Sequence, residues 1–184
     1  MGKIEDLAAE YERHICVPWQ RTVAGAQRVV MVVYEKELER TFRARIAEFE
    51  QRTRGAGHGW VQHDVTGAFA EWMGAMRYRD AYFENPADLS LEGSGGFRDH
   101  VVGPLKKVLE ASDDETVVAL TGVGSLYGFV RVSEVVREVE PSIPGRLVVF
   151  FPGSRDGNTY RLLDARDGWN YLAHSITLHG VGGR

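Results

Sequence analysis

A serine in a glycine-rich turn is the first group in this sequence whose position suggests chemistry. Ser125 follows Gly122 and Gly124, precedes Gly128, and comes just after an apolar run typical of a strand. A strand, a glycine turn and a helix in this order can hold a phosphate, because free N–H groups at a helix N-terminus attract anions. A serine between a strand and a helix is also where α/β-hydrolases place their nucleophile. The turn therefore has two chemical interpretations, phosphate binding and nucleophilic catalysis.

Phosphate binding has little support from the residues around the turn. The spacing of Gly122, Gly124 and Gly128 differs from the dinucleotide-binding fingerprint, and no glycine cluster in the chain is followed by Lys-Ser or Lys-Thr. The Walker A motif, whose lysine is the main charge partner of a bound nucleotide, is therefore missing from the sequence. We interpret the turn as a place where backbone packs closely, and we expect no cofactor. A degenerate nucleotide-binding domain with a regulatory role stays open as an alternative.

Nucleophilic catalysis by Ser125 is also weakly supported. The other members of a triad do follow it in the chain order of α/β-hydrolases, as Asp156 or Asp164 and then His174 or His179. The strained turn of that fold needs glycine two residues before and after the serine, where this chain has Val123 and Tyr127. We therefore interpret Ser125 as a helix N-cap or turn residue. A small serine hydrolase remains an alternative, and the main expectation is a protein with no catalytic residues.

Metal chemistry is not expected either. His58 and His63 are five residues apart, which places them on opposite faces of a strand, and His174 and His179 share that spacing. Cys16 is the only cysteine, so the usual structural zinc sets cannot form. The chain also has no Asp-x-Lys or Glu-x-Lys motif of the kind found in restriction-type nucleases.

The elements that would position these residues alternate along the chain. Apolar, β-branched runs predict strands at 27–34, 59–65, 116–121 and 146–151, with further edge or antiparallel strands at 159–163 and 171–178. Helical periodicity predicts helices at 3–14, 35–52, 66–78 and 129–139, and another that ends near Glu110 with Pro104 in its first turn. The stretch 84–96 is expected to be the longest loop. This alternation predicts one α/β domain over residues 1–184, Rossmann-like or degenerate P-loop-like, with a mostly parallel sheet covered by helices on both faces.

Composition narrows the setting in which the protein works. The formal net charge is −4 and the isoelectric point about 5.9, which argues against a dedicated nucleic-acid clamp. A lone cysteine suits a reducing cytosol, and no apolar run reaches the length of a membrane span. A cytoplasmic protein with no membrane contact is therefore expected.

Aromatic and arginine side chains near the expected strand ends have the composition of protein-interface anchors. They are Tyr127, Phe129, Arg131, Phe151, Arg155, Tyr160, Trp169 and Tyr171. Core packing is the alternative for each of them, since Phe150 and Phe151 cannot both face the same side of a strand.

The segment VALTGVGSLYGFVRV at 118–132 contains a Gly-x-Gly-Ser turn with aromatics and an arginine, and LVVFFPG at 147–153 reads as a strand ending in Phe-Pro-Gly. Both segments resemble motifs of the BrxB family of BREX (bacteriophage exclusion) proteins. Residues 157–171 are similar to the segment that follows. The chain departs from the pattern at Gly128, where proline is more usual, and at 171–173, where a more aromatic ending is expected.

The resemblance implies a small α/β protein encoded beside a phosphatase-like PglZ protein, a methyltransferase and a large ATPase, in systems that block phage and methylate host DNA. The family has no established catalytic residues. What the resemblance implies is a non-catalytic interaction or scaffold subunit that binds a PglZ-type partner and other BREX components, with any contact to DNA made through that complex. The positions that match the motif are taken as structural or interface positions: Gly122, Gly124, Ser125, Arg131, Pro152, Gly153, Asn170 and Tyr171.

Overall fold

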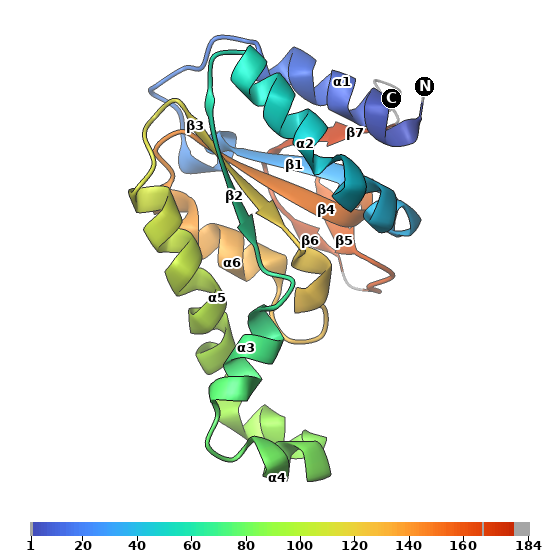
Figure 1. The fold of residues 1–184 in the computed structure, drawn as a ribbon, viewed down its shortest axis with the longest axis vertical. Coiled ribbons are helices and arrows are strands. Elements are labelled where there is room, and N and C mark those ends of the chain that lie inside the picture. The colour runs from blue at the N-terminus through green and yellow to red at the C-terminus, as the bar shows by residue number, and fades with distance from the viewer. Residues whose placement is uncertain (1, 167, 179–184) are drawn as a thin grey trace.

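A mostly parallel β-sheet forms the centre of the structure, a computed structural model that describes residues 2–166 and 168–178 (Figure 1). Its strands are β1 (Val29–Tyr34), β2 (Gly59–Asp64), β3 (Thr116–Thr121), β4 (Arg146–Asp156), β5 (Thr159–Leu162), β6 (Trp169–Asn170) and β7 (His174–Thr177). The parallel strands lie in the order β2-β3-β4-β1-β7, and β5 and β6 extend the far end of β4 in antiparallel fashion. The α/β class with a mostly parallel sheet is thus confirmed.

Helices cover both faces of this sheet. The α-helices are α1 (Lys3–Ile15), α2 (Glu39–Gly55), α3 (Ala68–Ala75), α4 (Arg79–Glu84), α5 (Gly93–Glu110) and α6 (Val132–Val139). Short 3-10 helices occur at η1 (Gly25–Arg28), η2 (Lys36–Leu38), η3 (Pro86–Glu92), η4 (Val123–Leu126) and η5 (Glu140–Ser142). In Figure 1, α1 and α2 lie on one face and α5 and α6 on the other. Among the described residues, no helix combines the length and hydrophobicity needed to cross a bilayer.

Two hydrophobic cores result, one on each face of the sheet. Every residue of β1 and of β3 is buried, as the continuous apolar runs predicted for strands covered on both sides. Successive side chains of β4 point to opposite faces, so Phe150 packs under α2 and Phe151 packs on the side of α6. Both rings are fully buried, which settles them as core residues.

The stretch expected to be the longest loop is largely helical. Residues 86–92 form η3, and α5 already begins at Gly93. A Cβ on Gly96 would be in ordinary van der Waals contact with the Trp72 indole, 3.7 Å away. The prediction of a loop at 84–96 was wrong because η3 packs on α4 and α5 packs on α3, and this packing favours helix where the local residues favour a loop.

The helix ending near Glu110 is also longer than expected, and Pro104 lies inside it rather than in its first turn. An interior proline removes one helical hydrogen bond. The helix continues past it because the buried stripe of Val101, Leu105 and Leu109 holds both halves of α5 against the sheet. Packing of the apolar stripe therefore outweighs the local preference of the proline.

The helix predicted at 66–78 is shorter in the structure. It ends at Ala75, and a second short helix, α4, begins at Arg79. Figure 1 shows α3 and α4 extending away from the sheet, at the end of the molecule opposite α1. This projecting part carries one wall of a groove described below.

Candidate functional site

A cleft opens at the carboxyl edge of the sheet, where the chain leaves β1 toward one face and leaves β3 toward the other. Open α/β sheets bind their ligands at such a switch in direction. The cleft has a volume of about 480 Å³ and is lined by Lys36, Glu37, Glu39, Arg43, Gly124, Ser125, Pro152 and Leu163. We call it the sheet-edge cleft, and it brings together three of the motif residues predicted from the sequence: Gly124, Ser125 and Pro152.

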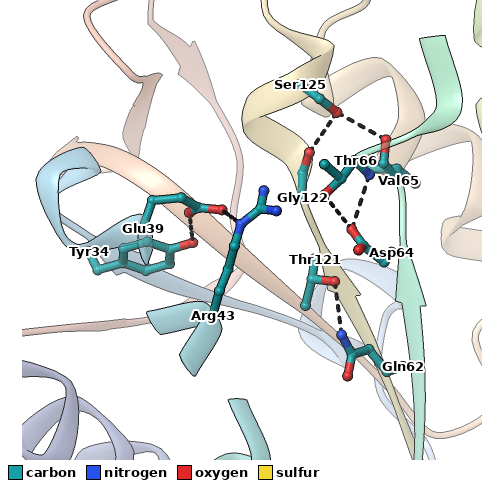
Figure 2. Close-up of polar contacts among 10 residues, drawn as sticks. All are labelled: Tyr34, Glu39, Arg43, Gln62, Asp64, Val65, Thr66, Thr121, Gly122 and Ser125. Carbon is teal, nitrogen blue, oxygen red and sulfur yellow. Dashed lines mark hydrogen bonds and ion pairs between the residues drawn. The ribbon is translucent and has the colours of Figure 1, made fainter. Parts of the chain in front are cut away.

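Ser125 is held by the backbone of the turn. Its hydroxyl lies within donor distance of the Gly122 carbonyl at 2.8 Å and the Val65 carbonyl at 3.0 Å (Figure 2). A hydroxyl that donates to carbonyls links the turn after β3 to the end of β2, and it is not oriented by a base. Of the triad partners considered above, Asp164 forms an ion pair with Lys36, His174 stacks on His14, and His179 lies outside the described residues.

Gly122 adopts a left-handed conformation, with φ of +77°, at the tightest point of the turn. A Cβ placed there would lie 2.2 Å from Thr66 Oγ1, 2.4 Å from Asp64 Oδ1 and 2.7 Å from the Thr66 backbone nitrogen. The Asp64 carboxylate in turn accepts hydrogen bonds from the Thr66 amide at 3.0 Å and the Thr66 hydroxyl at 2.6 Å. Figure 2 shows these groups around Gly122, where the loops after β2 and β3 pack closely against each other.

On the other side of the cleft, Glu39 is shared by two partners. The Tyr34 hydroxyl donates to Glu39 Oε2 at 2.5 Å, and Arg43 Nε donates to Glu39 Oε1 at 2.7 Å. Burial, with the Glu39 carboxylate beside it, raises the pKa of Tyr34 well above its ordinary value. The hydrogen bond to Glu39 raises the pKa of Arg43, and Asp64 adds to this effect. Both partners of Glu39 are therefore held in their proton-bearing forms.

The charge balance of the sheet-edge cleft does not favour a phosphate. Its cations are Lys36, which pairs with Asp164 and lies 3.9 Å from Glu37, and Arg43, which pairs with Glu39. The carboxylates beside the two cations neutralise their positive charge in the protein without a bound anion. A nucleotide would have to displace these ion pairs, so the site gives the nucleotide-binding alternative little electrostatic support.

A second hollow, which we call the aromatic groove, lies beside the projecting helices. It has a volume of about 590 Å³ and is lined by Phe69, Trp72, Met73, Tyr82, Phe83, Pro86, Leu89, Phe97, Gly128 and Phe129. Its floor is a stack of rings, with the centroids of Phe69 and Phe129 4.0 Å apart and those of Phe69 and Phe97 5.4 Å apart. Phe83 is 67% exposed and Phe129 44% exposed. Phe83 and Phe129 thus expose large apolar side chains to solvent at the groove.

An adjoining cleft of about 640 Å³ lies on the other side of the turn at Gly128 and Phe129. Its lining includes Tyr127, which is 49% exposed, and Arg131, which is exposed at the start of α6. Arg131, predicted as a structural or interface position, therefore lies on the surface near the aromatic groove.

The remaining motif residues lie in and around the hairpin formed by β4 and β5. Pro152 pairs with Tyr34 in register, and a Cβ on Gly153 would come 2.1 Å from the Arg161 carbonyl oxygen. The Asn170 side chain accepts a hydrogen bond from the Thr159 hydroxyl at 2.9 Å, and its carbonyl accepts one from Arg137 at 3.2 Å. The buried Tyr171 donates to Glu140 Oε2 at 2.5 Å. Pro152, Gly153, Asn170 and Tyr171 therefore contact neighbouring strands and loops of the same chain.

The aromatic residues noted in the sequence differ in burial. Phe151, Tyr160 and Tyr171 are buried, Trp169 is partly buried, and Tyr127 and Phe129 are exposed. Phe83 and Leu89 of the aromatic groove were missed: Phe83 lies in α4, a helix that was not predicted, and Leu89 falls in the stretch expected to be a loop. The helical spacing of Phe69, Trp72 and Met73 is visible in the sequence, and all three residues line the groove.

Three of the described histidines stack on other rings. His58 stacks on Trp19 with ring centroids 3.8 Å apart and lies 3.1 Å from Glu115, and His14 stacks on His174 at 3.8 Å. Within residues 2–166 and 168–178, no group of three or more histidine, cysteine, aspartate or glutamate side chains is arranged to hold a metal ion.

The His14 imidazole makes stability depend on pH. Burial, with His174 and Arg146 nearby, lowers the pKa of His14 from 6.5 to about 4. The unfolded chain therefore binds this proton more readily, and the free energy of unfolding is expected to fall as pH decreases from about 6.5 to about 4. Urea unfolding measured across this range checks the slope. His14→Gln should make the slope shallower than in the parent chain; equal slopes in the two proteins would contradict the assignment.

Fold and site together define an α/β protein with a sheet-edge cleft and an exposed aromatic groove. The family model described as BREX protein BrxB matches residues 83–176, just over half of the chain, and the chain belongs to that family. It is therefore a component of a BREX phage-defence system. No curated protein and no solved structure matches the chain.

Proposed function

We propose that this protein is a non-catalytic interaction subunit of its BREX system and that it binds the PglZ-type protein encoded with it. The observation that carries the proposal is the aromatic groove, since large apolar side chains left exposed around a hollow mark places where proteins associate. The complex is expected in the cytoplasm, with DNA reached only through other components.

The chemistry of the groove fits a protein partner. Aromatic side chains are enriched at the centres of protein interfaces, where a few of them carry most of the binding energy. Phe83 and Phe129 are exposed at the groove, and Tyr127 is exposed in the adjoining cleft. Arg131 adds a guanidinium at the edge of the same surface, a second residue type that interfaces favour.

We infer the absence of catalysis from the hydrogen bonds and ion pairs that the polar groups of the sheet-edge cleft form within the protein. The Ser125 hydroxyl links two backbone carbonyls, and the two cations of the cleft are paired with carboxylates. A nucleophile needs a base within hydrogen-bond reach, and a phosphate site needs free positive charge. The Ser125 hydroxyl instead connects the loops after β2 and β3, and Lys36 and Arg43 form ion pairs within the protein.

Co-purification tests the proposal. The chain carrying a C-terminal tag, expressed together with the other components of its operon, is expected to elute with the PglZ-type protein in equal amounts. The chain alone is expected to turn over neither ATP, nor an activated ester, nor DNA. Recovery of the chain alone while the other components assemble would refute the adaptor role. Turnover abolished by Ser125→Ala would refute the lack of catalysis.

A further inference from the structure

We infer that the aromatic groove receives an amphipathic helix of the PglZ-type partner, with large apolar side chains on one face and lysine or arginine along the side that meets α4. This inference rests on the proposed function, because it names the kind of segment that the interaction subunit would recognise. Three features of the groove carry it: its walls, its floor and the charges on its rim.

The walls of the groove favour a helix over a β-strand that pairs through its backbone. They come from α3, α4, η3 and α5 and from the turn at Gly128 and Phe129. A strand would bind by pairing its backbone with an open sheet edge, and these walls are helices and a turn, whose backbone offers no such edge. A helix satisfies its own backbone hydrogen bonds and needs only a groove for side chains at spacings of three, four and seven residues.

The floor of the groove is already ordered. Phe69 stacks on Phe129, Phe97 meets both rings edge to face, and the Trp72 ring lies 5.4 Å from that of Phe97. Rings that pack on one another lose little further freedom when a ligand covers them, which favours binding. A volume of about 590 Å³ lies within the range of pockets that enclose small ligands, so it can take about two or three large apolar side chains.

The rim supplies the charge complementarity. Asp80 and Glu84 lie four residues apart on α4, on the same side of the helix, and Asp88 follows in η3. Arg79 lies 3.7 Å from Asp80, whereas Glu84 and Asp88 form no ion pair with any residue that the structure describes. Two carboxylates beside an apolar groove attract a partner segment with basic residues next to its apolar face.

Binding measurements on the full chain test the inference. The probe is the purified PglZ-type protein, with affinity measured by calorimetry at low and high salt. Phe83→Ser removes the most exposed ring, and Glu84→Lys combined with Asp88→Lys reverses the rim charge. Each is expected to weaken binding by about tenfold or more, and the charge reversal should also reduce the dependence of affinity on salt. Val17→Ser, at an apolar residue 57% exposed beyond the end of α1, is the matched control and should bind as the parent does.

Cross-linking identifies the segment that enters the groove. With p-benzoylphenylalanine at position 83, irradiation of the complex is expected to link the chain to a partner peptide with helical apolar spacing and flanking lysine or arginine. A cross-link to an acidic segment, to an extended segment or to a second copy of this chain would overturn the inference. Unchanged affinity in both groove variants would also overturn it, while leaving the interaction role intact. If the parent chain does not bind the PglZ-type protein at all, the proposed function itself fails.

Discussion

Phe150→Ala is expected to lower the free energy of unfolding by roughly 3–5 kcal/mol, a large part of the stability of an ordinary domain. The Phe150 ring is fully buried under α2, with its centroid 4.7 Å from that of Phe42, 5.0 Å from that of Phe49 and 6.3 Å from that of Trp60. Removing it leaves a cavity between three aromatic neighbours that cannot collapse without moving the helix or the sheet. Urea unfolding followed by circular dichroism measures the loss.

Phe83→Ala is the matched control for this prediction. The same ring is removed, but Phe83 is 67% exposed at the rim of the aromatic groove, so its loss should change the free energy of unfolding by no more than about 0.5 kcal/mol. A similar destabilisation in both variants would mean that Phe83 is not a free surface residue. A small loss in Phe150→Ala would contradict the two-core description of the sheet.

The sheet could be predicted because its strands are short apolar runs between polar turns. The runs at 27–34 and 116–121 are buried on both faces, and burial on both faces gives a continuous pattern that the sequence shows directly. Strand order follows from long-range packing and could not be predicted. The helical character of 84–96 could not be predicted either, because Pro86 and the glycines at 93–96 favour a loop locally, whereas packing of η3 on α4 and of α5 on α3 favours helix.

The sheet-edge cleft was also partly visible in the sequence, but the aromatic groove was not. Gly122 and Ser125 lie in one short turn after a strand, so their proximity follows from chain connectivity. The groove is formed by the consecutive elements α3, α4, η3 and α5 together with the turn at 128–129, which is distant in sequence and meets them only in the folded protein. The charge pairing that disfavours a nucleotide, such as Lys36 with Asp164, likewise joins residues far apart in the chain.

The second large effect is expected for Gly122→Ala, which should lower the free energy of unfolding by roughly 2–4 kcal/mol. Part of the loss arises because a residue with a side chain is strained at φ of +77°. The rest arises because the new Cβ would overlap Thr66 Oγ1, Asp64 Oδ1 and the Thr66 backbone nitrogen. The side chains can rotate away only by giving up the hydrogen bonds of Asp64, and the backbone nitrogen can move only with the whole loop. Thermal or urea unfolding gives the size of the loss.

Gly128→Ala separates these two contributions. Gly128 has nearly the same left-handed backbone, with φ of +82°, yet a Cβ there would meet no atom within 4 Å. Its substitution should therefore cost only the backbone strain, about 1 kcal/mol. The difference between the two variants then measures how tightly the loops after β2 and β3 are locked together. Equal losses would mean that the contact around Gly122 contributes nothing beyond the conformation of its own backbone.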